Sequence, residues 1–191
     1  NIVIFGPPGA GKGTQSNLIV KKFNLHQLST GEILRNEIRN KTKLGNEIST
    51  IINNGNLVSD SLVSNLIEKY ISNDLYKNKL IFDGYPRNIN QAKNLDYLLK
   101  KYDQKINLVL KLSVSLDTIK KRISERKDLE RRVDDTEEIA IKRYVNYENN
   151  IKTVIEFYKQ SNLLRVVDGE ASITEISSEI SGLMESIKGW L

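Results

Sequence analysis

Asn1-Ile2-Val3-Ile4-Phe5 followed by Gly6-Pro7-Pro8-Gly9-Ala10-Gly11-Lys12-Gly13-Thr14 is the stretch that decides the fold of this chain. An apolar, β-branched run stops at a glycine, a Gly/Pro-rich turn follows, and a helical pattern begins at Lys12. This order predicts a buried strand, a phosphate-binding loop and a helix N-terminus. Glycines suit such a loop because backbone N–H groups converge on one point only where no Cβ blocks close approach. Lys12 adds a mobile positive charge that suits β and γ phosphates.

Two other interpretations of this stretch are weaker. A dinucleotide-binding fingerprint that started at Gly9-x-Gly11 would need a glycine where Thr14 stands. A structural turn without a ligand does not explain a lysine at the start of a helix, where the helix dipole disfavours cations. The Ser/Thr that usually follows the lysine and contacts Mg²⁺ is Gly13 here, so the motif does not supply that hydroxyl. We therefore expect polyphosphate binding by Gly9, Ala10, Gly11, Lys12, Gly13 and Thr14.

The composition is typical of a folded, water-soluble α/β domain with room for small inserts. The chain has 191 residues, of which 39% are hydrophobic and 28% charged, and it has no apolar run long enough to span a bilayer. It contains no cysteine, which excludes disulfides and cysteine-based zinc sites. We expect a structural or exposed role for the single histidine, His26, and a cytoplasmic protein because no signal-peptide pattern is present. The net charge of +5 leaves nucleic acid, a membrane surface or small anions open as partners.

Strand and helix patterns alternate along the whole chain, which predicts a doubly wound parallel sheet of five strands. Residues 30–59 show helical patterns only and are expected to form an insert on this α/β core. In the first helix, Leu18, Ile19 and Phe23 are expected to face the core. The predicted strands are 1–5, 26–28, 80–83, 107–112 and 163–167. The predicted helices are 12–23, 31–40, 43–54, 60–72, 88–102, 117–127, 136–159 and 173–187.

Three of these strands end at a glycine or at an Asp-Gly pair. Gly6, Asp83-Gly84 and Asp168-Gly169 are therefore expected at the carboxyl edge of the sheet, where α/β proteins bind ligands. The apolar strand that ends in Asp83 can hold Mg²⁺ through its carboxylate, directly or through water. The turn Gly84-Tyr85-Pro86-Arg87 comes next and favours a functional carboxylate over a common strand-end aspartate.

Arginines gather in one part of this lysine-rich chain. Arg122 and Arg126 lie four apart on one helix and point the same way, Arg131 and Arg132 follow in a loop, and Arg143 begins the next helix. Each alone fits a solvated surface, but the set with Lys12 would neutralise the repulsion between two phosphorylated molecules. The sequence therefore predicts phosphoryl transfer between anions. No aromatic residue lies between Arg122 and Arg132, which disfavours RNA binding.

These motifs resemble the adenylate kinases of the nucleoside monophosphate kinase family, over essentially the whole chain. The stretches that carry the resemblance are 6–15, 28–31, 55–60, 83–87 and 132–135. The resemblance implies a three-layer P-loop fold whose core comprises 1–29, 60–126 and 134–191. It implies a nucleoside-monophosphate-binding insert at 30–59 and a short lid at 127–133, without the strand hairpin and zinc site of long-lid relatives. It also implies a cis peptide bond between Tyr85 and Pro86.

The resemblance further implies reversible, Mg²⁺-dependent phosphoryl transfer from ATP to AMP that gives two ADP directly, without a covalent intermediate. Asp83 would orient Mg²⁺ through water, and no zinc would bind. The chain would be a monomer that uses neither nucleic acid nor a membrane. The implied ATP-binding residues are Gly9, Ala10, Gly11, Lys12, Gly13, Thr14, Arg122 and Arg126. The implied AMP-binding residues are Thr30, Arg35, Leu57, Val58, Gly84, Arg87, Gln91, Arg132 and Arg143. The implied catalytic residues are Lys12, Arg87, Arg126, Arg132 and Arg143.

Three alternatives remain open at the level of sequence. A UMP/CMP kinase shares the fold and the arginines, although those enzymes usually carry alanine in place of Thr30, and Gln91 stands where adenylate kinases read adenine. GTP could replace ATP as the donor, because donor-base contacts are mostly made by backbone. Outside this class, the chain could be a nucleotide-binding protein without catalytic activity.

Overall fold

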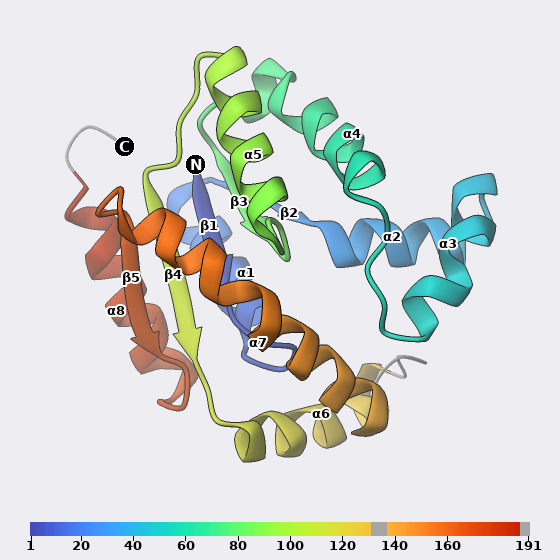
Figure 1. The fold of residues 1–191 in the computed structure, drawn as a ribbon. Coiled ribbons are helices and arrows are strands. Elements are labelled where there is room, and N and C mark those ends of the chain that lie inside the picture. The colour runs from blue at the N-terminus through green and yellow to red at the C-terminus, as the bar shows by residue number, and fades with distance from the viewer. Residues whose placement is uncertain (131–136, 188–191) are drawn as a thin grey trace.

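The computed structural model describes residues 1–130 and 137–187, with side chains for all of these except 126–130 and 137. Five parallel strands form one sheet in the order β2-β3-β1-β4-β5 (Figure 1). The predicted five-stranded parallel sheet is therefore confirmed. The strands are β1 (Ile2–Phe5), β2 (His26–Ser29), β3 (Leu80–Asp83), β4 (Leu108–Ser113) and β5 (Leu164–Asp168).

Helices connect the strands close to the predicted positions. The structure adds a short 3-10 turn, η1 (Asp74–Tyr76), which was not predicted. Helix α6 continues to Glu130, so residues 127–130 of the predicted lid are helical, and the rest of that segment lies outside the described residues. None of the described helices combines the length and apolar character needed to cross a bilayer. The helices are α1 (Lys12–Phe23), α2 (Thr30–Arg39), α3 (Lys43–Asn53), α4 (Asp60–Ile71), α5 (Ile89–Lys101), α6 (Leu116–Glu130), α7 (Glu137–Lys159) and α8 (Ile173–Glu185).

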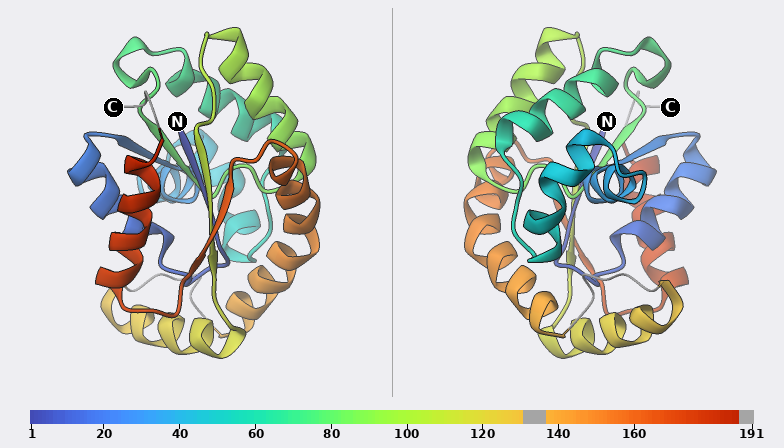
Figure 2. Two further views of the ribbon diagram at one scale, coloured as in Figure 1. Left: turned by 90° about the vertical axis from the view of Figure 1, so that its left-hand side faces the viewer. Right: turned by 90° about the vertical axis from the view of Figure 1, so that its right-hand side faces the viewer.

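The sheet separates two hydrophobic layers, because alternate side chains of a strand point to opposite faces. Val3 and Phe5 pack with α4, α5 and α7, whereas Ile2 and Ile4 pack with α1 and α8. Figure 2 shows this three-layer arrangement with the sheet nearly edge-on. In α1, Ile19 is buried as predicted and Phe23 is partly buried. The prediction for Leu18 was wrong: it is 37% exposed, because α1 turns a narrow face to the sheet.

Polar caps fix where several helices begin. The Ser29 hydroxyl accepts from the Glu32 backbone N–H, Thr42 accepts from Gly45, and Asn88 accepts from Gln91. Each cap satisfies a backbone N–H that the first helical turn leaves without a partner. These caps set where α2 and α5 leave the carboxyl edge of the sheet. The same edge carries the candidate site.

The segment 30–59, here called the insert, extends away from the sheet on the side of β2 (Figure 1). It consists of α2, α3 and the loop that leads to α4. Helices α2 and α3 approach so closely that a Cβ on Gly45 would lie 2.0 Å from the backbone oxygen of Glu37. Helix α3 ends at Asn53, and Gly55 just beyond it has a φ of 71° in the left-handed region, as the Asn54-Gly55 pair predicts.

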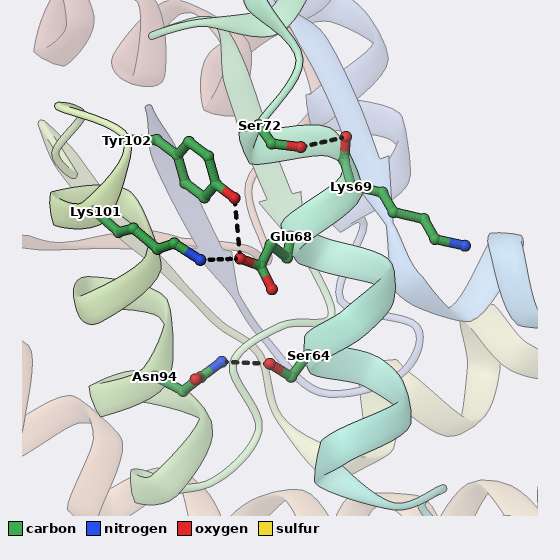
Figure 3. A network of polar contacts seen from close by, with 7 residues as sticks. All are labelled: Ser64, Glu68, Lys69, Ser72, Asn94, Lys101 and Tyr102. Carbon is green, nitrogen blue, oxygen red and sulfur yellow. Dashed lines mark hydrogen bonds and ion pairs between the residues drawn. The ribbon is translucent and has the colours of Figure 1, made fainter.

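Helices α4 and α5 are fastened to each other by polar contacts along their length (Figure 3). Asn94 donates to the Ser64 hydroxyl at 2.8 Å. Farther along, Glu68 Oε1 accepts from Lys101 Nζ at 2.8 Å and from the Tyr102 hydroxyl at 3.0 Å. Because α4 starts where the insert ends, this pairing anchors the insert to the core.

A third, small hydrophobic cluster lies apart from the two main layers. It joins α6 and α7 through Ile119, Ile123 and Ala140, with Val114 and Tyr144 packed against it. Among the described residues it contains no side chain from a strand. It lies beneath the glycine-rich loop, since a Cβ on Gly9 would be 3.1 Å from Ile123.

Candidate active site

The glycine-rich loop runs from the end of β1 to the start of α1 and has the backbone geometry of an anion cradle. Gly9 and Gly11 have φ of 83° and 90°, which side chains disfavour. A turn closes from the Ala10 N–H to the Pro7 carbonyl at 3.1 Å. Helix α1 begins at once and has no acidic residue in its first turn. Its backbone N–H groups and the positive end of its dipole therefore favour a phosphate at this point.

Lys12 folds back over this loop. Its ammonium donates to the backbone oxygens of Gly6 at 2.8 Å and Pro7 at 3.1 Å. The charge is therefore held over the loop and does not extend into solvent. In the first turn of α1, a Cβ on Gly13 would meet nothing within 4 Å, and Thr14 is exposed. That turn is open to a ligand.

Arg122 joins helix α6 to the glycine-rich loop. Its guanidinium donates to the Gly169 carbonyl at 2.8 Å and to the Ala10 carbonyl at 3.5 Å. Gly169 follows β5, so the contact joins two strand ends, as the edge argument predicts. Arg126 lies one turn later on α6, and nothing is described of its side chain; Arg132 falls outside the described residues.

Asp83 ends β3, next to the strand that leads into the glycine-rich loop. Its Cα pairs with Ile4 in the sheet register. The residue is only 8% exposed, and its Oδ2 accepts from the Gln27 side chain at 2.9 Å. Across the described residues, no three histidine, aspartate or glutamate side chains cluster as a metal cage. The protein thus offers a single oriented carboxylate beside the loop, which suits a hard cation that takes its other ligands from phosphate and water.

A pocket, here called the arginine pocket, lies between the insert and the core. Its wall combines α2, the α3–α4 loop, the end of β3, the start of α5, and α7. The structure brings together here eight of the nine residues that the sequence assigned to AMP. They are Thr30, Arg35, Leu57, Val58, Gly84, Arg87, Gln91 and Arg143.

Three arginines, Arg35, Arg87 and Arg143, face one another across this pocket. Arg87 Nε donates to the Gly84 carbonyl at 2.7 Å. Arg87 is exposed to the open space of the pocket, and the neighbouring protein groups desolvate its guanidinium only in part. This desolvation, followed by the charges of Arg143 and then Arg35, lowers the pKa of Arg87 to about 10, against the opposing effect of Asp83. A phosphate anion would relieve the repulsion.

Two glycines leave the space that the guanidiniums occupy. A Cβ on Gly31 would lie 3.2 Å from Arg35 Nη1, and one on Gly84 would lie 3.2 Å from Arg87 Nη2. The sequence prediction included Gly84 but not Gly31. Gly84 also has a φ of 76°, which side chains disfavour. Both this backbone conformation and the close approach of Arg87 therefore favour glycine at this position.

The remaining wall of the arginine pocket is neutral. The buried Thr30 hydroxyl donates to the Gly84 carbonyl at 3.0 Å. Gln91 is 3% exposed, and its Oε1 accepts from the Arg87 backbone N–H at 2.7 Å. Val58 is buried, whereas Leu57 is 40% exposed at the rim. The pocket therefore presents positive charge together with a neutral surface of apolar and amide groups.

The comparisons with known proteins agree with this geometry. A family model described as adenylate kinase matches residues 4–163. A protein named adenylate kinase from Pelagibacter ubique is 41% identical and aligns with 97% of this chain and 99% of its own length. Proteins of the same name from Fusobacterium nucleatum and Porphyromonas gingivalis are 38% and 37% identical, over 94% and 98% of this chain and 96% and 97% of their own lengths.

The chain belongs to the adenylate kinase family.

Within this adenylate kinase fold, the predicted residues fall into two groups at the carboxyl edge of the sheet. Lys12 and Arg122 lie at the glycine-rich loop, with Asp83 at the adjacent strand end. The other group lines the arginine pocket. The Tyr85–Pro86 peptide bond is cis, as the resemblance implies.

Several residues that contact the candidate site were not predicted from the sequence. Gln27 orients Asp83 from the neighbouring strand, and a polar residue inside a buried strand is the signal that could have revealed it. Asp60 and Asn88 both hydrogen-bond to Gln91, but Asp60 was noted only as a helix start within the stretch 55–60, and Asn88 only as a helix start. Lys142 of α7 donates to the Asn54 carbonyl at 2.8 Å, and no local pattern signals that long-range contact.

Proposed function

We propose that this protein is an adenylate kinase that transfers the terminal phosphoryl group of ATP to AMP, reversibly, giving two ADP. The observation that carries the proposal is the pairing of two anion sites at one sheet edge. The glycine-rich loop with Lys12 suits a polyphosphate, and the arginine pocket suits a nucleotide with a single phosphate. The names of the relatives support the same substrates.

The proposed reaction is a direct in-line transfer. A phosphate oxygen of AMP attacks the γ-phosphorus of ATP, the bond to the β–γ bridging oxygen breaks, and ADP leaves with that electron pair. The attacking oxygen is already ionised, so no general base is needed. Lys12, Arg87 and Arg143 would bring the two anions together and stabilise the charge of the transition state. Arg126 and Arg132 are proposed for the same task.

The residues fit a Mg²⁺ ion bound through phosphate and water. Asp83 would orient its water shell, and Gln27 holds that carboxylate in place. A Mg²⁺ ion held there would neutralise negative charge on the donor phosphates. Gly13 and Thr14 leave the first turn of α1 open for this assembly.

The proposed division of labour follows the fold. The insert 30–59 would close over AMP, the short lid 127–133 would close over ATP, and the remaining residues would form the fixed core. Closure excludes water and so suppresses ATP hydrolysis. Because the site is built within a single chain, a monomer is part of the proposal. So is a cytoplasmic location, where ATP and AMP are available. Arg35, Arg87 and Arg143 face a pocket and not an open surface, which supports a small nucleotide over nucleic acid.

A coupled assay for ADP formation tests the proposal. The wild-type protein should form ADP from ATP and AMP with Mg²⁺, and should use AMP better than UMP or CMP. Lys12→Met should lower kcat about a thousandfold or more, since it removes the charge at the donor phosphates. Lys21→Met, which changes an exposed lysine on the same helix, should behave as wild type. ATP binding without ADP formation would refute the proposal.

A further inference from the structure

Asp60, the first residue of α4, receives side chains from the start of α5. Its Oδ1 accepts from Gln91 Nε2 at 2.7 Å and from Asn88 Nδ2 at 3.0 Å, and its Oδ2 accepts from Asn88 Nδ2 at 3.1 Å. Two side-chain amides therefore converge on one carboxylate. This cluster lies where the insert rejoins the core, directly behind the wall of the arginine pocket.

The contacts leave only one orientation for the Gln91 amide. The backbone N–H of Arg87 can only donate, so it requires Oε1 on its side, at 2.7 Å. The Asp60 carboxylate only accepts when ionised, so it requires Nε2. If the oxygen and nitrogen of the Gln91 amide were exchanged, its NH2 group would face the Arg87 N–H and its oxygen would face the Asp60 carboxylate. Gln91 is only 3% exposed, so water could not relieve these contacts. Such an arrangement is strongly disfavoured in a buried site.

Asn88 is fixed in the same way and reinforces the arrangement. Its Oδ1 caps α5 by accepting from the Gln91 backbone N–H at 2.9 Å. Its Nδ2 must therefore face Asp60. Turning either amide over would break contacts at both ends of the cluster, so the cluster acts as one unit.

We propose that Asp60 is a positioning residue that sets the base specificity of the arginine pocket by fixing the Gln91 amide. This inference rests on the proposed function, with AMP in that pocket. A glutamine amide has two N–H groups and two oxygen lone pairs, and Asp60 and Arg87 each engage one. The remaining acceptor and donor match the N6 amino group and N1 of adenine. Hypoxanthine carries an oxo group at position 6 and a proton on N1, so it presents the opposite pattern to the same amide.

The pairing of α4 with α5 does not depend on Asp60 alone. The Asn94–Ser64 bond and the contacts of Glu68 with Lys101 and Tyr102 join the same two helices farther along (Figure 3). Loss of the Asp60 carboxylate should therefore remove one of the two contacts that orient the Gln91 amide while the helices stay together. The same contacts supply a matched control, because Ser64→Ala removes an α4–α5 hydrogen bond without touching Gln91.

The test compares AMP with inosine monophosphate (IMP) as acceptor, with ATP and Mg²⁺ as donor. The readout is the ratio of kcat/KM for AMP to kcat/KM for IMP. Asp60→Ala should lower this ratio about tenfold, because the inverted orientation of the amide, which matches hypoxanthine, is then opposed by the Arg87 backbone N–H alone. Asp60→Asn should stay within about threefold of wild type, since its amide oxygen can still accept from Gln91. Ser64→Ala should leave the ratio unchanged. If Asp60→Ala does not fold, Asp60→Ser replaces it, since its hydroxyl stops one bond short of the carboxylate oxygens.

A double-mutant comparison shows whether Asp60 acts through Gln91. In a Gln91→Ala background, Asp60→Ala should cause no further change in the AMP/IMP ratio. An unchanged ratio in the Asp60→Ala single variant, or an equal further fall in the Gln91→Ala background, would overturn the inference. A wild-type protein that does not phosphorylate AMP at all would instead refute the proposed function, so the two failures are distinguishable.

Discussion

Lys142 donates a hydrogen bond to the backbone carbonyl of Asn54 at 2.8 Å, and this contact joins helix α7 to the end of helix α3. The carbonyl is one that the last turn of a helix leaves without an internal partner, and a lysine at that end also suits the helix dipole. The loop that begins at Asn54 carries Leu57 and Val58, which line the arginine pocket. The contact thus holds one wall of the pocket against the core.

Removal of this contact should weaken AMP binding without slowing the chemical step. We expect Lys142→Met to raise the KM for AMP about two- to fivefold and to leave kcat nearly unchanged, as for the loss of one exposed hydrogen bond. Lys152→Met, on an exposed site of the same helix, serves as the control. Equal KM values for the two variants would show that the Lys142 contact does not hold the pocket wall.

The arginine pocket should be stabilised by anions. AMP at a hundred times its Kd should add about 2.7 kcal/mol to the free energy of unfolding, because only the folded protein binds it. Arg87→Met and Arg35→Met should reduce the rise in Tm at the same AMP concentration, whereas Arg39→Met, an exposed site on α2, should not.

The pKa of Arg87 is lowered to about 10, so Arg87 is protonated at neutral pH and AMP affinity should fall as pH rises through that value. Differential scanning fluorimetry from pH 7 upward measures both effects, and an equal Tm shift in all variants would contradict them.

Gly45 should be essential for the insert to fold. A Cβ there would lie 2.0 Å from the Glu37 oxygen and 2.4 Å from its carbonyl carbon, both backbone atoms of α2. Gly45→Ala should therefore force α2 and α3 apart and destabilise the protein by about 3 kcal/mol. Gly182→Ala, in α8 with open space around it, should instead stabilise by about 0.5–1 kcal/mol. Urea denaturation measures both changes, and a Gly45→Ala variant as stable as wild type would show that the helices can separate at no cost.

The single histidine should make stability depend on pH near neutrality. His26 stacks on Tyr76, with ring centroids 4.3 Å apart, and on Tyr70, and burial lowers the pKa of His26. The folded protein therefore binds this proton less readily than the unfolded chain. The stabilising contribution is present above the unfolded pKa of about 6.5 and is lost as pH falls through that value toward the folded pKa.

Urea denaturation at pH 8 and pH 5.5 tests this expectation. The free energy of unfolding should fall more between these values in the wild type than in His26→Phe, which keeps an aromatic ring but cannot titrate. Carboxylates contribute equally to both proteins. The difference between wild type and His26→Phe in the loss of unfolding free energy is therefore due to His26. Equal falls would show that the ring stack does not discriminate against the charged histidine.

The elements of the fold could be predicted because each has a local physical signal. The apolar run before Gly6 and the one ending at Asp83 are strands with almost the predicted bounds, and the caps at Ser29 and Asn88 start helices where expected. The C-terminal limit of α6 was missed, because a charged segment from Lys127 to Glu130 carries no apolar period and no stop signal.

The parts of the site that escaped prediction are pairings between distant segments. Gln27 meets Asp83, and Asp60 meets Gln91, through polar contacts that have no sequence period. The close approach at Gly45 is likewise set by two helices packing, and a glycine inside a helical pattern does not reveal it. Eight of the nine residues assigned to AMP line the arginine pocket together, because their motifs occur in characteristic stretches of the family.

The small cluster of Ile119, Ile123 and Ala140 has a consequence for how the molecule opens. Its buried residues belong to neither main layer and meet one of them at Val114, so we expect α6 and the start of α7 to separate from the sheet with little exposure of the principal core. Such a region unfolds locally with a lower free energy than the sheet. Its amide hydrogens should exchange with solvent faster than those of β1 and β3. A bound nucleotide that engages Arg122 would slow this exchange, so exchange protection in α6 would report occupancy of the glycine-rich loop.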